Sequence, residues 1–220
     1  MSYPINYPTP QGANVQIFQA PNRSGANNGV TWVKPQGASF VWFTLIGTGA
    51  RGNATTGGGS GAVTNFMCPA FLIPDSLVIR VGQENTSTTQ ILYQQKDGTG
   101  YTLLTAQSAT GSSQGGATAA NAFTAMGFYQ SIAGQDGTTG AVSASTTTFL
   151  SGGGAYSGSA ITANYGYVIG STNSDANGIF QMQPIVVGAG GKGVGNGGIG
   201  CGGGVDSGKG GNGLVVIITW

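Results

Sequence analysis

Three glycine-containing motifs resemble phosphate-binding loops. Residues 47–52 and 188–193 both fit the dinucleotide pattern G-x-G-x-x-G after an apolar run, and residues 203–209 fit G-x-x-x-x-G-K. Such loops bind phosphate where a helix follows at once, because the helix N-terminus holds the anion. Glycine-rich sequence follows each motif here, and glycine costs about 1 kcal/mol per helical position. We therefore attribute all three motifs to the high glycine content and predict no nucleotide cofactor.

Groups for acid–base and metal chemistry are scarce. The chain has no histidine and six carboxylates, which excludes a Ser-His-Asp triad, a Cys-His pair and any histidine-based zinc site. Asp175 and Asp206 lie in Gly/Asn/Ser-rich stretches of the kind that bind calcium in repeats, but each stretch occurs once, so we interpret both as solvated turn residues. The sequence predicts a protein that is not an enzyme and has no metal. A carbohydrate-cleaving enzyme with two paired carboxylates is the remaining enzymatic alternative.

Three tyrosines flank a glycine tract at residues 151–158, namely Tyr156, Tyr165 and Tyr167. Tyr, Asn, Ser and Gly are the residue types that loops use to recognise carbohydrate and protein. The three side chains either contact such a ligand or pack on the bare backbone of the tract.

The composition excludes other classes of protein. Glycine supplies 43 of the 220 residues, 7 cationic and 6 anionic side chains leave a net charge of +1, and the cations are scattered from Arg23 to Lys209. A nucleic-acid binder that neutralises phosphates needs a basic stripe, so we expect no nucleic-acid partner. No stretch approaches the roughly 20 apolar residues of a membrane span, and the first residues do not resemble a secretory signal. We expect synthesis in a cytoplasm and no membrane insertion.

Short β-branched or aromatic runs bounded by Gly, Pro, Asn and Asp predict an all-β fold. We expect a jelly-roll-like β-sandwich with strands at residues 15–18, 40–46, 62–67, 77–81, 90–93, 101–105, 165–169 and 214–220. The last of these is apolar throughout and is predicted to close a sheet. Residues 117–130 alone show a helical spacing, through Phe123, Met126 and Tyr129, and predict one short amphipathic helix.

Three glycine tracts interrupt the strands, at residues 47–61, 151–158 and 188–213. The last has 15 glycines in 26 residues, without proline or a fixed period of three, which excludes collagen. Such a tract is either a flexible loop or a set of packed, extended threefold helices of the polyproline type. We expect packing, because so long a structureless loop is unusual in a compact domain.

The chain divides into an extended arm at residues 1–30, which contains four prolines, and a glycine-rich β-sandwich domain at residues 31–220. We expect the arm to dock on a neighbouring subunit. Cys68 and Cys201 either form a disulfide or are two small buried hydrophobic residues, and we favour the second interpretation.

Four segments together resemble the glycine-rich domain found in many bacteriophage and other viral virion proteins. Residues 32–38 resemble its opening aromatic-x-x-Pro-x-Gly turn, and residues 40–61 its first long strand and glycine tract. Residues 72–82 resemble its Pro-Gly-x-Leu-x-Val-x-Val-Gly segment, with Asp75 in place of the usual glycine. Residues 188–220 resemble its closing tract and Gly-x-Val-Ile-Ile-x-aromatic strand.

The resemblance covers residues 31–220 and implies a β-sandwich with glycine-rich loops or polyglycine helices, without cofactor or catalytic residues. We therefore expect a structural virion protein on a phage capsid or tail, associated with other virion proteins and assembled as a homo-oligomer, with a trimer as the expected state. The alternative is a receptor-binding adhesin that recognises host surface glycan or protein through its glycine-rich loops.

Overall fold

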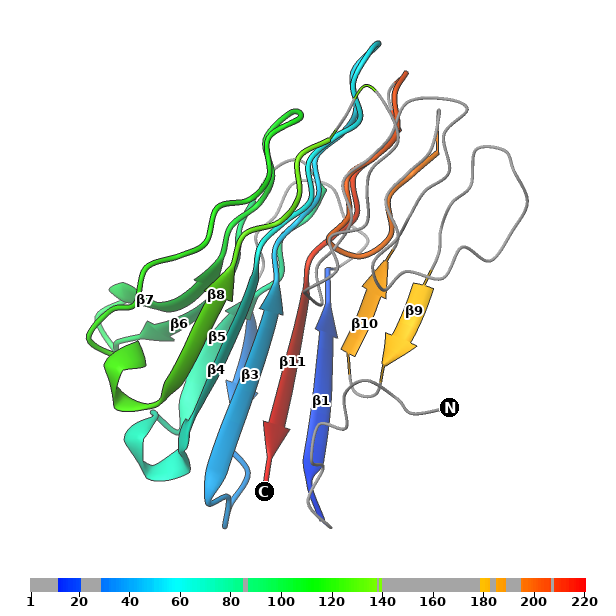
Figure 1. Ribbon diagram of the computed structural model, residues 1–220. Coiled ribbons are helices and arrows are strands. Elements are labelled where there is room, and N and C mark those ends of the chain that lie inside the picture. The colour runs from blue at the N-terminus through cyan, green and yellow to red at the C-terminus, as the bar shows by residue number, and fades with distance from the viewer. Residues whose placement is uncertain are drawn as a thin grey trace.

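The computed structural model describes residues 12–20, 29–84, 87–137, 139, 179–182, 185–188, 195–206 and 208–220. These residues form strands and two short 3-10 helices (Figure 1). The elements are, in order, β1 (Asn14–Gln19), β2 (Val30–Val33), β3 (Phe40–Ile46), β4 (Val63–Pro69), η1 (Ala70–Leu72), β5 (Ser76–Arg80), β6 (Thr89–Gln94), β7 (Gly100–Ala106), η2 (Thr124–Met126), β8 (Phe128–Ile132), β9 (Ile179–Met182), β10 (Ile185–Gly188) and β11 (Leu214–Thr219).

Two antiparallel sheets make a β-sandwich. Sheet A has the strand order β1-β11-β3-β4-β8, and sheet B has the order β2-β5-β6-β7. Strands β9 and β10 pair with one another in a separate two-stranded sheet. The predicted all-β sandwich is therefore confirmed.

The main core lies between the two sheets. Alternate residues of β3, Val41, Phe43 and Leu45, are fully buried and belong to one apolar cluster with Leu77 and Ile79 of β5. This alternation follows from the two-residue period of a strand, which points successive side chains to opposite faces.

The last strand, β11, lies inside sheet A, between β1 and β3. All six of its residues are buried, and its ladder pairs Ile217 with Phe43 of β3 and with Gln16 of β1. The prediction that the apolar C-terminal run closes a sheet is confirmed.

The face of sheet A turned away from sheet B is also apolar. We call its buried residues Ile46, Val63, Leu214, Val216 and Ile218 the outer cluster. None of the five strands of sheet A contains a charged residue. Sheet A therefore buries apolar side chains on both of its faces.

The helix predicted at residues 117–130 is wrong. The segment contains only η2, whose start is fixed by Asn121 through a 2.9 Å hydrogen bond from the Thr124 amide to the Asn121 side chain. Gly127 ends η2, and the residues after it form β8, which pairs with β4. Cross-strand pairing overrides the helical spacing of Phe123 and Met126.

The other strand predictions differ in outcome. Seven expected strands correspond to β1, β3, β4, β5, β6, β7 and β11, whereas the strand expected at residues 165–169 lies outside the described residues. Strands β2, β8 and β9 are not predicted by the sequence, and β10 lies at the apolar run before the motif at residues 188–193. The expected arm at residues 1–30 is not wholly separate from the sandwich, because β1 is part of sheet A.

Candidate functional site

The glycine tracts lie side by side beyond the ends of the sheet A strands (Figure 1). We call this assembly the glycine bundle, and its members are residues 47–53, 57–62, 107–115, 134–137, 195–204 and 208–213. Backbone hydrogen bonds join these members to one another, although the members lie outside the strands and their ladders. The expectation of packed tracts is confirmed for the described parts of the tracts at residues 47–61 and 188–213.

The central tract, residues 57–62, donates hydrogen bonds to a different neighbour at each successive position. The Gly58 and Gly61 amides donate to carbonyls in tract 195–204, and the Gly59 and Ala62 amides donate to carbonyls in tract 107–115. Ser60, between them, donates to the Gln135 carbonyl at 2.8 Å. A repeat of three is the signature of a polyproline-type helix, which has three residues per turn and leaves its backbone groups to bond outward.

Tract 47–53 repeats the pattern. The Gly47 and Ala50 amides donate to the central tract, while the Gly49 and Gly52 amides donate to the Gly211 and Gly208 carbonyls at 2.9 and 3.0 Å. Buried backbone N–H and C=O groups must have hydrogen-bond partners, so each tract depends on its neighbours to supply them.

Glycine is required at these positions because the backbones approach closely. A Cβ atom at Gly49 would overlap the Cys201 carbonyl, one at Gly58 the Ala50 carbonyl, and one at Gly211 the Gly198 carbonyl. Glycine is the residue that permits such backbone contact. Close backbone packing therefore explains why glycine occupies these positions.

A threonine connects the bundle to the sandwich. The buried Thr89 hydroxyl donates to the Ile46 carbonyl at 2.7 Å and accepts from the Gly82 amide at 3.2 Å. The Gly213 amide then donates to the Gly82 carbonyl at 2.9 Å. This chain of bonds holds the start of β11 against both sheets.

Polar turns end the bundle. The Asn53 side chain accepts from the Thr55 and Thr56 amides at 2.9 and 2.7 Å, and the Asp136 carboxylate accepts from the Gln114 amide at 2.8 Å. These residues are exposed or nearly so, apart from Thr56, which is half-buried. These hydrogen bonds hold each turn in one backbone conformation. The end of the bundle is therefore a polar surface whose turns have little conformational freedom.

Three charged side chains interact at the side of the bundle. Burial raises the pKa of Glu84 above its ordinary value, and the positive charges of Lys209 and Arg51 act in the opposite direction. The Glu84 amide donates to the Asn212 side chain at 2.8 Å. This grouping orders the loop after β5 against tract 208–213.

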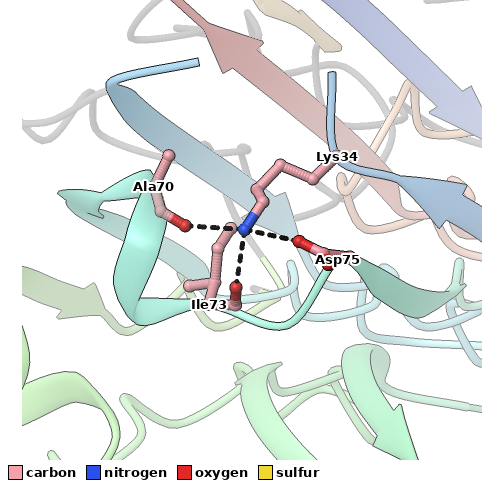
Figure 2. A network of polar contacts seen from close by, with 4 residues as sticks. All are labelled: Lys34, Ala70, Ile73 and Asp75. Atoms are coloured by element: carbon pink, nitrogen blue, oxygen red, sulfur yellow. Dashed lines mark hydrogen bonds and ion pairs between the residues drawn. The ribbon is translucent and has the colours of Figure 1, made fainter. Parts of the chain in front are cut away.

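A lysine joins the opening turn to the link between the sheets (Figure 2). The Lys34 ammonium donates to the Ala70 and Ile73 carbonyls at 3.0 and 2.9 Å and lies 2.9 Å from the Asp75 carboxylate. The side chain of Lys34 is 17% exposed and that of Asp75 is 90% exposed. This contact is not predicted from the sequence, although Asp75 occupies the position of a glycine in the family segment that residues 72–82 resemble.

Among the described residues, the motifs that resemble phosphate-binding loops are not followed by a helix. Residues 47–52 continue into the bundle and not into a helix, and residues 203–209 continue toward β11. The motif at residues 188–193 falls mostly outside the described residues. Within the described ranges, no group of three His, Cys, Asp or Glu side chains is placed to hold a metal ion.

The candidate ligand contacts Tyr156, Tyr165 and Tyr167, and the glycine tract at residues 151–158, lie outside the described residues. The two cysteines are described, and both are buried without a disulfide between them. Cys68 is part of the main core, and burial raises the pKa of its thiol to about 11. Both cysteines therefore act as small buried side chains.

The sequence matches no family model, and no curated protein is significantly similar to it.

Among the described residues, no helix combines the length and the apolar character that a membrane span requires.

Proposed function

We propose that the protein is a structural component of a virus particle, a bacteriophage capsid- or tail-surface protein that assembles as a homo-oligomer. The observation that supports this role most is the glycine bundle, in which six tracts satisfy one another's backbone groups. Such a bundle is a stiff extension of the sandwich, because each tract is held by several neighbours. Backbone hydrogen bonds between the tracts hold it together.

The resemblance to the glycine-rich domain of virion proteins is consistent with this proposal. Residues of the matching segments have structural roles. Lys34, in the segment at residues 32–38, contacts Asp75, and the two glycine tracts pack on one another. A particle-surface protein must keep its shape outside the cell, and the burial of Cys68 and Cys201 suits that demand because it protects their thiols from oxidation.

Fractionation of virus-containing material on a density gradient tests the proposal. Peptide mass spectrometry of each fraction should find this protein with the particles that contain nucleic acid. Its copy number relative to the major shell protein then distinguishes a coat from a spike. Recovery of the protein only among free soluble proteins would contradict the proposal.

The second candidate function is a receptor-binding adhesin, and the polar turns of the bundle favour it. The turns at Asn53 and Asp136 are held by their own hydrogen bonds and expose hydroxyl, amide and carboxylate groups, which are the groups that recognise glycans and protein surfaces. Purified protein should then bind host cells and block infection. An Asn53→Ala variant should bind more weakly, whereas Asp97→Ala, in the turn between β6 and β7, should not.

A further inference from the structure

Strand β1 is an edge of sheet A among the described residues. There it shares a ladder with β11 alone, and its sequence NVQIFQ contains no charge, proline or glycine. Val15 and Ile17 are 39% and 48% exposed. Proteins usually protect an edge strand by charge, proline, a bulge, short length or a covering segment, because its free N–H and C=O groups invite another strand.

The other edges of the sandwich carry such protection. Strand β2 has only four residues and is followed at once by Lys34. Along β7, the side chains of Thr118 and Asn121 donate to the Thr105 and Leu103 carbonyls, both at 3.1 Å.

The β8 edge is protected by the same covering segment. The Thr118 amide donates to the Ser131 hydroxyl at 2.9 Å, and the Tyr129 hydroxyl donates to the Thr118 carbonyl at 2.7 Å. Residues 117–121 thus bridge the two sheets on that side. Strands β9 and β10 form their own sheet and share no ladder with β1.

The exposed side chains of β1 continue the outer cluster. Val15 lies opposite Ile218 in the ladder, and Ile17 lies opposite Val216. The apolar band on the outer face of sheet A therefore runs through β11 to the edge strand β1, where it remains partly exposed to water. A partner that continues the sheet would cover this margin.

We propose that two copies of this chain associate by antiparallel pairing of their β1 strands about a two-fold axis at Gln16. This register places Val15 opposite Ile17 of the partner subunit, on the same face, so that apolar pairs form on both sides of the axis. A second copy fits because the strand is uncharged and its two exposed apolar residues, Val15 and Ile17, are symmetric about Gln16, as an isologous contact requires. The two copies of sheet A become one continuous sheet.

This inference goes beyond the proposed function, because pairing through β1 does not depend on where the protein acts. It also concerns symmetry. A two-fold contact produces dimers or other even-numbered assemblies, in place of the trimer expected from the sequence.

Cross-linking of the full chain tests the contact. Residues directly opposite one another in an antiparallel pair have Cα atoms about 4.5–5.5 Å apart, which suits a disulfide. Gln16→Cys should therefore give a covalent dimer on mild oxidation. Thr31→Cys, at an exposed position of the β2 edge, is the matched control and should not. The native Cys68 and Cys201 are buried. Equal cross-linking of the two variants, or none in either, would overturn the proposal.

The mass in solution is the second measurement. Light scattering should give the unaltered chain the mass of two copies, and Ile17→Lys the mass of one with an unchanged circular dichroism spectrum. Val33→Lys, which places the same charge on the exposed β2 edge, should keep the mass of two. A one-copy or three-copy mass for the unaltered chain would contradict β1 pairing. If Ile17→Lys does not fold, the cross-linking result decides.

Discussion

The Nζ atom of Lys34 lies 2.9 Å from Oδ1 of Asp75, and the Lys34 amide donates to the Asp75 carbonyl at 2.8 Å. Two segments far apart in the sequence, the turn after β2 and the link from η1 to β5, are thereby joined at two points. The ammonium also holds the Ala70 and Ile73 carbonyls. The lysine thus fastens the connection by which the chain passes from sheet A to sheet B.

Replacement of Lys34 should cost much more stability than replacement of Asp75. Lys34→Met removes a charged donor from two carbonyls and should lower the free energy of unfolding by about 2–3 kcal/mol. Asp75→Asn alters an exposed ion pair and should cost less than about 1 kcal/mol. Urea unfolding of both variants gives the comparison. Equal losses would show that the ion pair, not the carbonyl contacts, fastens the link.

Alanine in the glycine bundle should be far more damaging than alanine at an open glycine. Gly49→Ala and Gly211→Ala force a Cβ atom into a backbone carbonyl and should each destabilise the fold by about 3 kcal/mol or more. The control is Gly116→Ala, where a Cβ atom meets nothing within 4 Å. The control should change the stability by less than about 0.5 kcal/mol. Thermal unfolding that ranks all three variants alike would contradict close packing.

Removal of residues 214–220 should abolish folding. The truncation deletes β11, whose ladders connect β1 to β3 and whose six residues are buried. The loss should exceed the roughly 5–15 kcal/mol by which domains are stable. Circular dichroism and a thermal melt report the result. A truncated chain that keeps its β spectrum and a cooperative transition would show that sheet A closes without β11.

The Cys68 thiol should be unreactive in the folded protein. A pKa of about 11, raised by burial, leaves little thiolate at pH 8, and alkylating reagents attack the thiolate. Peptide mapping after iodoacetamide treatment should find Cys68 modified only in denaturant. Rapid modification of Cys68 in the native state would show that this edge of the core opens.

The same shift predicts a loss of stability at high pH. The folded state holds the Cys68 proton more tightly than the unfolded state, whose pKa is near 9.0. The unfolded state therefore binds fewer protons as the pH rises from about 9 toward 11, and stability falls across that interval. Cys68→Ala should show a smaller decline over the same range, and an identical decline in both proteins would assign it to other groups.

The strands with dense apolar runs were predictable. β3, β5 and β11 combine β-branched and aromatic residues with flanking turn residues, so local sequence alone identifies them. Strand β8 was not, because Phe128–Ile132 is half polar and becomes a strand through its pairing with β4. The packing of the long glycine tract could be expected from its length, since a loose loop of that size is rare.

The details of the bundle could not be predicted. Which neighbour accepts from Gly58 and which from Gly59 depends on tracts more than fifty positions away. Spacing in the sequence does not show this threefold pattern, because glycines and small residues alternate irregularly. The Lys34 contact was hidden for the same reason, since nothing near Lys34 in the sequence indicates its distant acceptors.

Residue-resolved amide hydrogen exchange tests most directly whether the glycine tracts form a hydrogen-bonded bundle. The Gly58, Gly59 and Gly61 amides each donate to a neighbouring tract at 2.7–2.9 Å, so they should exchange on the same time scale as the amides of β3. If these three amides exchange as fast as in an unstructured peptide while β3 remains protected, the tracts are loose loops and do not form a hydrogen-bonded bundle.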